Sequence, residues 1–241
     1  MKSNTYFKDS ALEALRGNWG NAVLTTLVVV LLVCMISGPA VYTTYRTQVL
    51  LESYSATSLS DVMELAQDPE IVAAAHQSRG ASSLTTIIEI FLLLPLQVGL
   101  VNAFRKLLEN GDTNLLSNTF RFTNYWRKVG GMLLMSILVF LWTLLLIVPG
   151  IIKLFSYAMT PYILDEYPEL TASEAIHRSR MMMKGHKFDL FWLFLSFIGW
   201  SILCLFTCGI GYLWLYPYMQ TAEAAFYREV KADYALHGGL D

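Results

Sequence analysis

Six long runs of apolar residues, separated by polar segments, dominate the pattern of hydrophobic and polar positions along this 241-residue chain. The runs cover residues 22–42, 84–104, 129–148, 151–165, 189–206 and 210–227. A helix needs about 20 apolar residues to cross a hydrocarbon layer of about 30 Å, and most of the runs approach that length. The pattern therefore predicts an all-α, polytopic membrane protein with six transmembrane helices in three hairpins.

Two of the polar segments have helical spacing of their apolar positions. Residues 1–20 and 171–185 are each predicted to form an amphipathic helix at the membrane surface, the second one on the cytoplasmic side. The second begins with a capping box, because Thr171 and Glu174 stand three residues apart at its start. Pro149-Gly150, between the third and fourth runs, predicts a tight turn.

Residues 43–83 form the longest polar interruption, rich in serine, threonine, alanine and acidic residues. We predict an extracytoplasmic loop that carries a short helix, with Ser60 as its N-cap and Asp68-Pro69 as its end.

Composition and charge support a membrane protein and give its orientation. The chain is 55% hydrophobic and only 15% charged, whereas soluble domains usually carry about 25% charged residues. With six spans, 14 of the 17 lysines and arginines fall on the side of the termini, and the other three are Arg46, Arg79 and Lys153. Positive residues accumulate on the cytoplasmic side, so we expect both termini in the cytoplasm. A cleaved signal peptide is the competing interpretation of the first run.

The three hairpins share features along the sequence. Each odd run follows a basic segment marked by an aromatic residue, Trp19, Trp126 or Phe188, and each even run carries one proline, Pro95, Pro161 or Pro217. A threefold repeat of one surface helix and one hairpin would explain this. The needs that all membrane hairpins share would explain it equally, and both interpretations stay open.

Two charged residues lie most clearly inside the predicted spans, away from their cytoplasmic ends. Glu89 and Lys153 are at similar depths on the outer side, and a charge inside a bilayer is costly. They form either an intramembrane ion pair that lines a polar pocket, or two side chains that each reach the outer interface.

Uncharged and acidic polar residues also lie on the cytoplasmic halves of the second and sixth spans. Gln97, Gln220 and Glu223 are candidates to line a cavity, or else to hold helices together by hydrogen bonds. The helix-packing role is the favoured one.

The basic segments beside the membrane suggest contacts with anionic lipids, since each lysine or arginine near such a surface contributes about 1 kcal/mol. The candidate contact residues are Arg178, Arg180, Lys184, Lys187, Arg127 and Lys128. A protein partner, which includes a second copy of the chain, is a further possibility.

Candidate chemistry is sparse. The sequence has no nucleophile elbow, zinc-protease or phosphate-loop motif, and its four histidines are scattered. The three cysteines, Cys34, Cys204 and Cys208, lie in or beside apolar runs and suggest neither a disulfide framework nor a metal site. We predict no catalytic residue, no metal, no cofactor and no nucleic-acid partner.

The carboxyl-terminal half resembles the bacterial integral membrane family called domain of unknown function 975. The resemblance rests on the strings VPGIIK (148–153), SYAMTPYIL (156–164), YPELTASEAI (167–176), MMKGHK (182–187) and LSFIGW (195–200), with ALRGNWGNA (14–22) near the amino terminus. The pattern is more distantly similar to the membrane portion of some bacterial glycerophosphodiester phosphodiesterases, without their catalytic barrel. The resemblance implies a location in the bacterial inner membrane and names no catalytic residue.

These observations together predict a non-catalytic inner-membrane protein that organises the membrane, associates with lipid or binds a partner. The alternative is a small-molecule transporter or channel subunit with a polar site near the outer leaflet.

Overall fold

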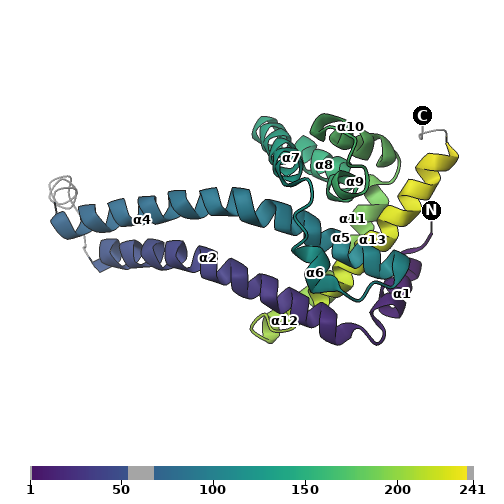
Figure 1. Cartoon of the computed structure of the whole chain (residues 1–241). Helices are drawn as coiled ribbons and strands as arrows, with labels where there is room; N and C mark the ends of the chain where they lie inside the picture. Colours follow the sequence, from purple (N-terminus) through teal and green to yellow (C-terminus); the bar gives the residue numbers. More distant parts are fainter. Residues whose placement is uncertain (1, 54–67, 238–241) are drawn as a thin grey trace. The chain divides into compact units, whose positions relative to one another are not determined.

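The computed structural model describes residues 2–53 and 68–237, which contain helices and no β-strand (Figure 1). The chain forms two compact units. Val28–Leu93 forms one of them, called here the hairpin unit, and Met1–Leu27 with Leu94–Asp241 forms the other, called here the main unit. Each unit is described by itself.

The hairpin unit consists of two long antiparallel helices that lie side by side (Figure 1). Its elements are α2 (Trp19–Ser53, from Val28 onward), α4 (Pro69–Ile88) and the π-helix η1 (Glu89–Leu93). The Thr47 hydroxyl donates a hydrogen bond to the Ala74 carbonyl oxygen at 3.3 Å, and Ile71 and Ala74 are buried. A hydrogen bond and a few small apolar contacts thus join the two helices.

The segment 43–83, predicted as a loop, is helical at both of its described ends. Helix α2 continues past residue 42 to Ser53, and α4 begins at Pro69. Residues 43–53 contain neither glycine nor proline, so nothing in their backbone interrupts the helix. Pro69 suits the first position of α4, where an amide hydrogen is not needed. The short helix predicted from Ser60 lies outside the described residues.

The main unit contains the remaining helices, most of them short. They are α1 (Asn4–Leu15), the first turns of α2, α5 (Leu94–Asn110), α6 (Leu115–Thr119), α7 (Tyr125–Leu145), α8 (Ile147–Tyr157), α9 (Thr160–Glu166), α10 (Ala172–Met182), α11 (Lys187–Leu195), α12 (Ile198–Phe206) and α13 (Tyr212–Leu236).

Helix α13 is the centre of the main unit. It packs against α1 and α5, and also contacts α10, α11 and α12. Its buried face includes Ala222, Ala224 and Ala225, whose small side chains allow neighbouring helices to approach closely. Phe226 meets Phe7 of α1 edge to face, with ring centroids 5.5 Å apart. Three apolar positions of α1 therefore face protein, since Phe7, Ala11 and Leu15 are completely buried, whereas Leu12 is exposed.

The third and fourth apolar runs form a hairpin, but its reversal differs from the prediction. Helix α7 ends at Leu145, the single extended residue Leu146 reverses the chain, and α8 begins at Ile147. Pro149 and Gly150 lie in the first turn of α8, where the ring of proline is tolerated. A β-carbon on Gly150 would lie 2.3 Å from the Thr143 hydroxyl oxygen, so this glycine allows α7 and α8 to come together.

Two of the apolar runs are interrupted near their middle or end. Residues 158–159 separate α8 from α9, and Pro161 stands in the first turn of α9, as expected for a break at this proline. Ser196 and Phe197 separate α11 from α12.

A short helix precedes each hairpin, and a residue in the left-handed conformation lies between the short helix and the hairpin. Gly17 (φ 82°) follows α1, Asn124 (φ 53°) precedes α7 after α6, and Gly185 (φ 84°) follows α10. A residue of positive φ changes the direction of the chain sharply, and glycine and asparagine adopt it most easily. The recurrence agrees with the predicted repeat of one surface helix and one hairpin.

Within residues 2–53 and 68–237, five helical segments are long and apolar enough to span a membrane. They are Trp19–Val49, Thr85–Asn110, Tyr125–Leu145, Ile147–Glu166 and Lys187–Phe206. Helix α13, the sixth predicted span, is not among them, because Gln220, Glu223, Arg228 and further charged residues make its second half polar. The all-helical class is confirmed, and the number of six spans stays a prediction.

Candidate functional site: a charged base and two pockets

One end of the main unit contains a network of charged side chains, called here the charged base. Asp165, at the end of α9, is its centre. The Asp165 carboxylate lies 2.7 Å from the Lys128 ammonium of α7 and 3.6 Å from the Arg105 guanidinium of α5. The Lys106 ammonium is 4.0 Å away. Three cations from two helices therefore surround one carboxylate, and the Lys128 side chain is only 2% exposed.

Polar bonds from α5 connect this network to the start of α9. The Asn102 amide donates hydrogen bonds to the carbonyl oxygens of Val98 (2.9 Å) and Pro161 (3.0 Å). The Asn102 side-chain oxygen accepts from Arg105 at 2.9 Å, and Arg105 also pairs with Glu109 at 2.7 Å. Asn102 and Arg105 are both buried, and the network satisfies their polar groups as burial requires.

Glu166 connects α9 to α13 in the same way. Its carboxylate accepts a hydrogen bond of 2.5 Å from the Tyr227 hydroxyl and pairs with Lys231. Tyr227 also stacks on Tyr162 of α9, with ring centroids 4.6 Å apart and planes 10° apart. Burial lowers the pKa of Lys231, but the hydrogen bond and charge of Glu166 outweigh this and raise it overall. Two consecutive acidic residues thus join α9 to α5, α7 and α13.

Two of the residues predicted to contact anionic lipid are instead used inside the charged base. Lys128 is buried against Asp165, and the Arg127 guanidinium donates to the carbonyl oxygens of Leu164, Tyr167 (3.0 Å) and Leu170 (2.5 Å). Leu164 lies in the last turn of α9 and the other two residues follow its end, so none of these carbonyls has a partner within that helix. The prediction for Arg127 and Lys128 is corrected, because sequence alone does not separate a basic residue that faces lipid from one that faces a carboxylate.

The other four candidates for lipid contact lie on or next to α10. Arg180 and Lys184 are exposed, and Lys187 is half-buried. The Arg178 guanidinium lies 4.0 Å from the ring centroid of Tyr167, a cation–π contact. The capping box of α10 is confirmed: Thr171 accepts from the Glu174 amide at 3.3 Å, and Glu174 accepts from the Thr171 amide at 2.7 Å. These hydrogen bonds from the Thr171 backbone and side chain lower the pKa of Glu174.

Gln97, Gln220 and Glu223 line one cavity of about 450 Å³, called here the polar pocket. Helices α5, α7, α8, α9, α11, α12 and α13 contribute to it. Its other lining residues are apolar or aromatic: Val101, Met132, Met135, Leu154, Phe155, Ala158, Pro161, Tyr162, Phe191, Phe194, Leu195 and Ile198. The structure thus brings the three predicted polar residues together around a cavity. The favoured role of Gln97 in holding helices together has no hydrogen bond to support it within the described residues.

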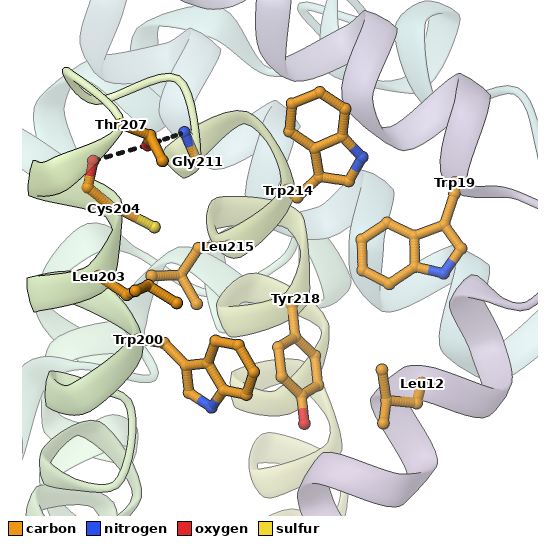
Figure 2. Close-up of a pocket in the computed structure, with 10 residues that line it drawn as sticks. All are labelled: Leu12, Trp19, Trp200, Leu203, Cys204, Thr207, Gly211, Trp214, Leu215 and Tyr218. Atoms are coloured by element: carbon orange, nitrogen blue, oxygen red, sulfur yellow. Dashed lines mark hydrogen bonds between the residues drawn. The ribbon is translucent and has the colours of Figure 1, made fainter.

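A second cavity of about 530 Å³, called here the tryptophan pocket, is almost entirely apolar (Figure 2). Its lining residues come from α1, the start of α2, α12, α13 and the turn before α13: Leu12, Trp19, Trp200, Leu203, Cys204, Thr207, Gly211, Trp214, Leu215 and Tyr218. Figure 2 shows the indole of Trp214 at the upper centre of the view, the indole of Trp19 to its right and the indole of Trp200 at the lower left.

A tight turn shapes the upper wall of the tryptophan pocket. The Thr207 hydroxyl donates to the Cys204 carbonyl oxygen at 2.8 Å and accepts from the Gly211 amide at 3.0 Å (Figure 2). Cys208 (φ 51°) and Gly209 (φ 84°) adopt the left-handed conformation. A β-carbon on Gly211 would lie 2.7 Å from the Cys204 sulfur, so glycine is required for this close approach.

Of the two charged residues predicted within the spans, only Lys153 has a side chain in the described part of the structure. The Lys153 ammonium lies 4.4 Å from the ring centroid of Trp142, so the aromatic face across the α7–α8 hairpin is its partner. Glu89 lies in the π-helix η1, and its side chain is outside the described part of the structure. The ion pair of Glu89 with Lys153 therefore stays a hypothesis.

Metal-ligating and redox chemistry have no support within residues 2–53 and 68–237. No cluster of three or more histidine, cysteine, aspartate or glutamate side chains in that part could hold a metal ion. All three cysteines are free; Cys204 is buried, whereas Cys34 and Cys208 are exposed.

The charged base was not predicted, although the sequence contains a signal for it. Asp165 and Glu166 directly follow an apolar run and stand among basic residues on the predicted cytoplasmic side. Acidic residues at such a position are natural partners for the nearby cations, which the count of positive charges had treated as exposed.

The described part of the chain is α-helical and contains five segments apolar enough to span a membrane. Residues 144–234 match the model of the family described as a protein of unknown function, DUF975. This confirms the predicted resemblance from the end of α7 through most of α13. Comparisons with curated proteins and with solved structures give no match.

Proposed function

We propose that this chain is a non-catalytic protein of the bacterial inner membrane, with six spans and both termini in the cytoplasm. The first five spans correspond to the five apolar segments, and the first half of α13 provides the sixth. Two features support this arrangement: the separation of basic residues along the sequence, and the position of charged side chains at one end of the main unit. The charged base then lies at the cytoplasmic end.

The role we propose is association with membrane lipid, and the tryptophan pocket is the observation that carries it. Its walls are apolar except for a few hydroxyl and indole groups, and Trp200, Trp214 and Leu203 are about half exposed. A cavity of this kind beside apolar spans is in contact with lipid hydrocarbon and not with water. A phospholipid acyl chain fits its chemistry, with the amphipathic indoles able to lie along the chain.

Brominated acyl chains test this proposal, because bromine quenches tryptophan fluorescence on contact. The chain contains six tryptophans, three in the pocket and three elsewhere. A variant with Trp126, Trp142 and Trp192 changed to Phe keeps only the pocket set. The matched control keeps these three and changes Trp19, Trp200 and Trp214 to Phe.

Both variants are reconstituted into nanodiscs with increasing fractions of brominated phosphatidylcholine. If the pocket binds an acyl chain, quenching of its three tryptophans should rise steeply and should saturate at a low fraction of brominated lipid. Quenching of the control set is expected to follow the fraction of brominated lipid, as for random contact. Equal curves for the two sets would contradict the proposal.

Basic residues on α10 and just after it extend the lipid association to the cytoplasmic surface. Arg180, Lys184 and Lys187 are the contacts we propose for anionic lipid; each contributes about 1 kcal/mol near such a surface. Changing all three to Gln should reduce the anionic phosphatidylglycerol that copurifies with the protein, measured by lipid mass spectrometry. Lys128→Gln is the contrasting variant. Because Lys128 is buried, this change tests the stability of the protein and not its contact with lipid.

Transport of a small molecule is the alternative function, and the polar pocket is the observation that favours it. A transporter must expose its site alternately to both sides of the membrane, which uptake into proteoliposomes would show. Association with a protein partner or with a second copy remains a prediction, for which size measurement of the purified protein in detergent is the test.

A further inference from the structure

The polar pocket is separate from the tryptophan pocket and shares no lining residue with it. Its volume of about 450 Å³ lies in the range of about 300–1,000 Å³ that small-molecule pockets occupy. Such pockets combine mostly apolar walls with a few polar groups that fix the orientation of a ligand. The polar pocket has this composition, so the nature of its polar groups indicates what it can hold.

Two of those polar groups have no partner: an amide oxygen, which accepts hydrogen bonds, and a hydroxyl, which both donates and accepts. The side-chain oxygen of Gln220 and the hydroxyl of Tyr162 are buried and have no hydrogen-bond partner within the described residues. Tyr162 is completely buried, and both residues line the pocket. A buried polar group without a partner destabilises the fold by about 1–3 kcal/mol, so a ligand that supplied donors would remove this cost.

Glu223 adds a carboxyl group three residues after Gln220, on the same face of α13. It forms no ion pair within the described part of the chain, whereas Asp165 and Glu166 in the charged base are both paired with cations. An ionised carboxylate among apolar groups needs a cation or a set of donors. The described residues of the main unit supply none to Glu223, so its carboxyl group is neutralised either by a proton or by a cation from outside.

The side chains around these polar groups are aromatic or apolar, which favours a cation that carries a hydrocarbon group. Phe155 meets Phe191 edge to face, with centroids 6.0 Å apart, and lies 6.3 Å from Phe194. Aromatic faces attract ammonium groups, most strongly where water is excluded. Met132 and Met135 complete the wall with flexible side chains that adapt to ligands of different shape.

The rim of the pocket indicates where a ligand enters. Leu154 of α8 is 48% exposed and Ile198 of α12 is 50% exposed, and both belong to segments apolar enough to span a membrane. An entrance between apolar, membrane-facing side chains admits molecules dissolved in the bilayer. The ligand must therefore be soluble in hydrocarbon over most of its length.

We propose that the polar pocket binds a lipophilic amine, whose ammonium group pairs with Glu223 and donates to Gln220 while its hydrocarbon part lies against the phenylalanines and methionines. The amine could belong to a free lipophilic molecule or to the headgroup of an ethanolamine lipid; both present the same chemistry.

A series of three ligands of one shape tests the charge requirement. Adamantylamine, adamantanol and adamantanecarboxylate share a hydrocarbon cage and differ in carrying a cation, a neutral hydroxyl or an anion. Binding to the purified full chain in phosphatidylcholine nanodiscs is measured by calorimetry. The proposal predicts that the amine binds about tenfold or more tightly than the alcohol, and that the carboxylate does not bind. Equal binding of amine and alcohol would overturn it.

Variants locate the site. Glu223→Gln keeps the shape of the side chain and removes its charge, so the tenfold preference for the amine should disappear while the alcohol binds as before. Glu229→Gln is the matched control on the same helix, because Glu229 pairs with Lys2 at 3.1 Å and does not line the pocket. An amine preference that survives Glu223→Gln, or is lost equally in Glu229→Gln, contradicts the assignment.

Labelling of the unmodified protein covers the case in which Glu223→Gln does not fold. Dicyclohexylcarbodiimide is an apolar reagent for carboxyl groups, and mass spectrometry locates its adduct. Adamantylamine should protect Glu223 from the reagent and adamantanol should not; a Glu223 that the amine leaves unprotected overturns the proposal.

Nanodiscs rich in phosphatidylethanolamine then distinguish the two sources of the amine. Weaker binding of adamantylamine in them identifies the lipid headgroup as the ligand, and unchanged binding identifies a free amine; the amine site stands in both cases.

Discussion

The two ends of helix α7 have opposite surroundings. At its first end Lys128, Val129 and Met132 are buried against the rest of the main unit. At its other end Phe140 is 66% exposed and Leu144 is 73% exposed, although both are strongly apolar. One helix therefore joins a region that buries polar groups to a region that exposes hydrophobic ones.

This difference shows where the main unit gets its specific structure. In the charged base, ion pairs and hydrogen bonds connect α5, α7, α9 and α13, and each has definite geometry. In the exposed apolar half of the α7–α8 hairpin, the side chains need only a hydrocarbon environment, which lipid supplies. Apolar contact with lipid contributes little to the choice between helix arrangements, because lipid chains are as apolar as leucine.

The largest expected effect follows from removing the centre of the charged base. Asp165→Ala leaves Arg105, Lys106 and Lys128 near one another without their shared carboxylate. Breaking a buried pair by removal of one partner destabilises a protein by about 3–5 kcal/mol. We expect the variant to unfold at a much lower temperature than the parent, as circular dichroism of the protein in detergent micelles would show.

Two further variants make this test specific. Asp189→Ala removes a carboxylate that is 42% exposed and lies 3.5 Å from His186, so it should change the unfolding temperature little. Asp165→Ala combined with Lys128→Met removes both partners and should recover part of the loss. If the double variant is no more stable than Asp165→Ala alone, the pair of Asp165 and Lys128 is not what stabilises the charged base.

The second prediction compares two leucines at opposite ends of the α7–α8–α9 hairpin. Leu164 is completely buried, and Leu144 is 73% exposed. Leu164→Ala should lower the free energy of unfolding by about 2–5 kcal/mol because it leaves a cavity. Leu144→Ala should have almost no effect in a lipid environment. Unfolding in detergent measures both, and similar losses would show that the exposed end also packs against protein.

The same contrast explains how far sequence could predict this structure. The helical class, five of the six apolar segments and the capping box at Thr171 follow from local patterns, and the described part of the structure has them. Such features depend on neighbouring residues alone, so a single sequence contains the information. Gln97, Gln220 and Glu223 were grouped because all three lie on the cytoplasmic halves of their predicted spans. The structure places them around one pocket.

The features that were missed depend on contacts between distant segments. Lys128 and Asp165 are 37 positions apart, and Tyr227 and Glu166 are 61 positions apart. A basic residue beside a span has the same local pattern whether it faces lipid or a carboxylate. The length of α2 was missed for a different reason: residues 43–53 are polar enough to suggest a loop, yet nothing in them prevents the helix from continuing.

The third prediction concerns two glycines in helices of the main unit. A β-carbon on Gly99 would lie 2.1 Å from the backbone carbonyl oxygen of Thr119, and backbone cannot move aside as a side chain can. Gly99→Ala should therefore destabilise the protein by about 1–3 kcal/mol. Gly130→Ala, where a β-carbon would meet nothing within 4 Å, should be neutral or stabilising by up to about 1 kcal/mol. Equal effects would show that α5 and α6 are not in close contact.

The smallest expected effect is local to α10. Thr171→Ala removes the hydroxyl that accepts from the Glu174 amide and donates to its carboxylate, and loss of such a cap costs about 1 kcal/mol. The amides of the first turn of α10 should exchange with deuterium faster, as mass spectrometry would detect. Ser173→Ala is the control, since Ser173 is exposed in the same turn and makes no capping bond.

The pH dependence of this last effect follows from the lowered pKa of Glu174. A carboxylate whose pKa is lower in the folded state stabilises that state above its ordinary pKa of 4.5, and the contribution is lost as the pH falls through the folded value. The difference in exchange between the parent and Thr171→Ala should therefore be largest near neutral pH and should shrink in acid. A difference that stays constant down to acid pH would mean that the hydroxyl caps the helix without help from the Glu174 charge.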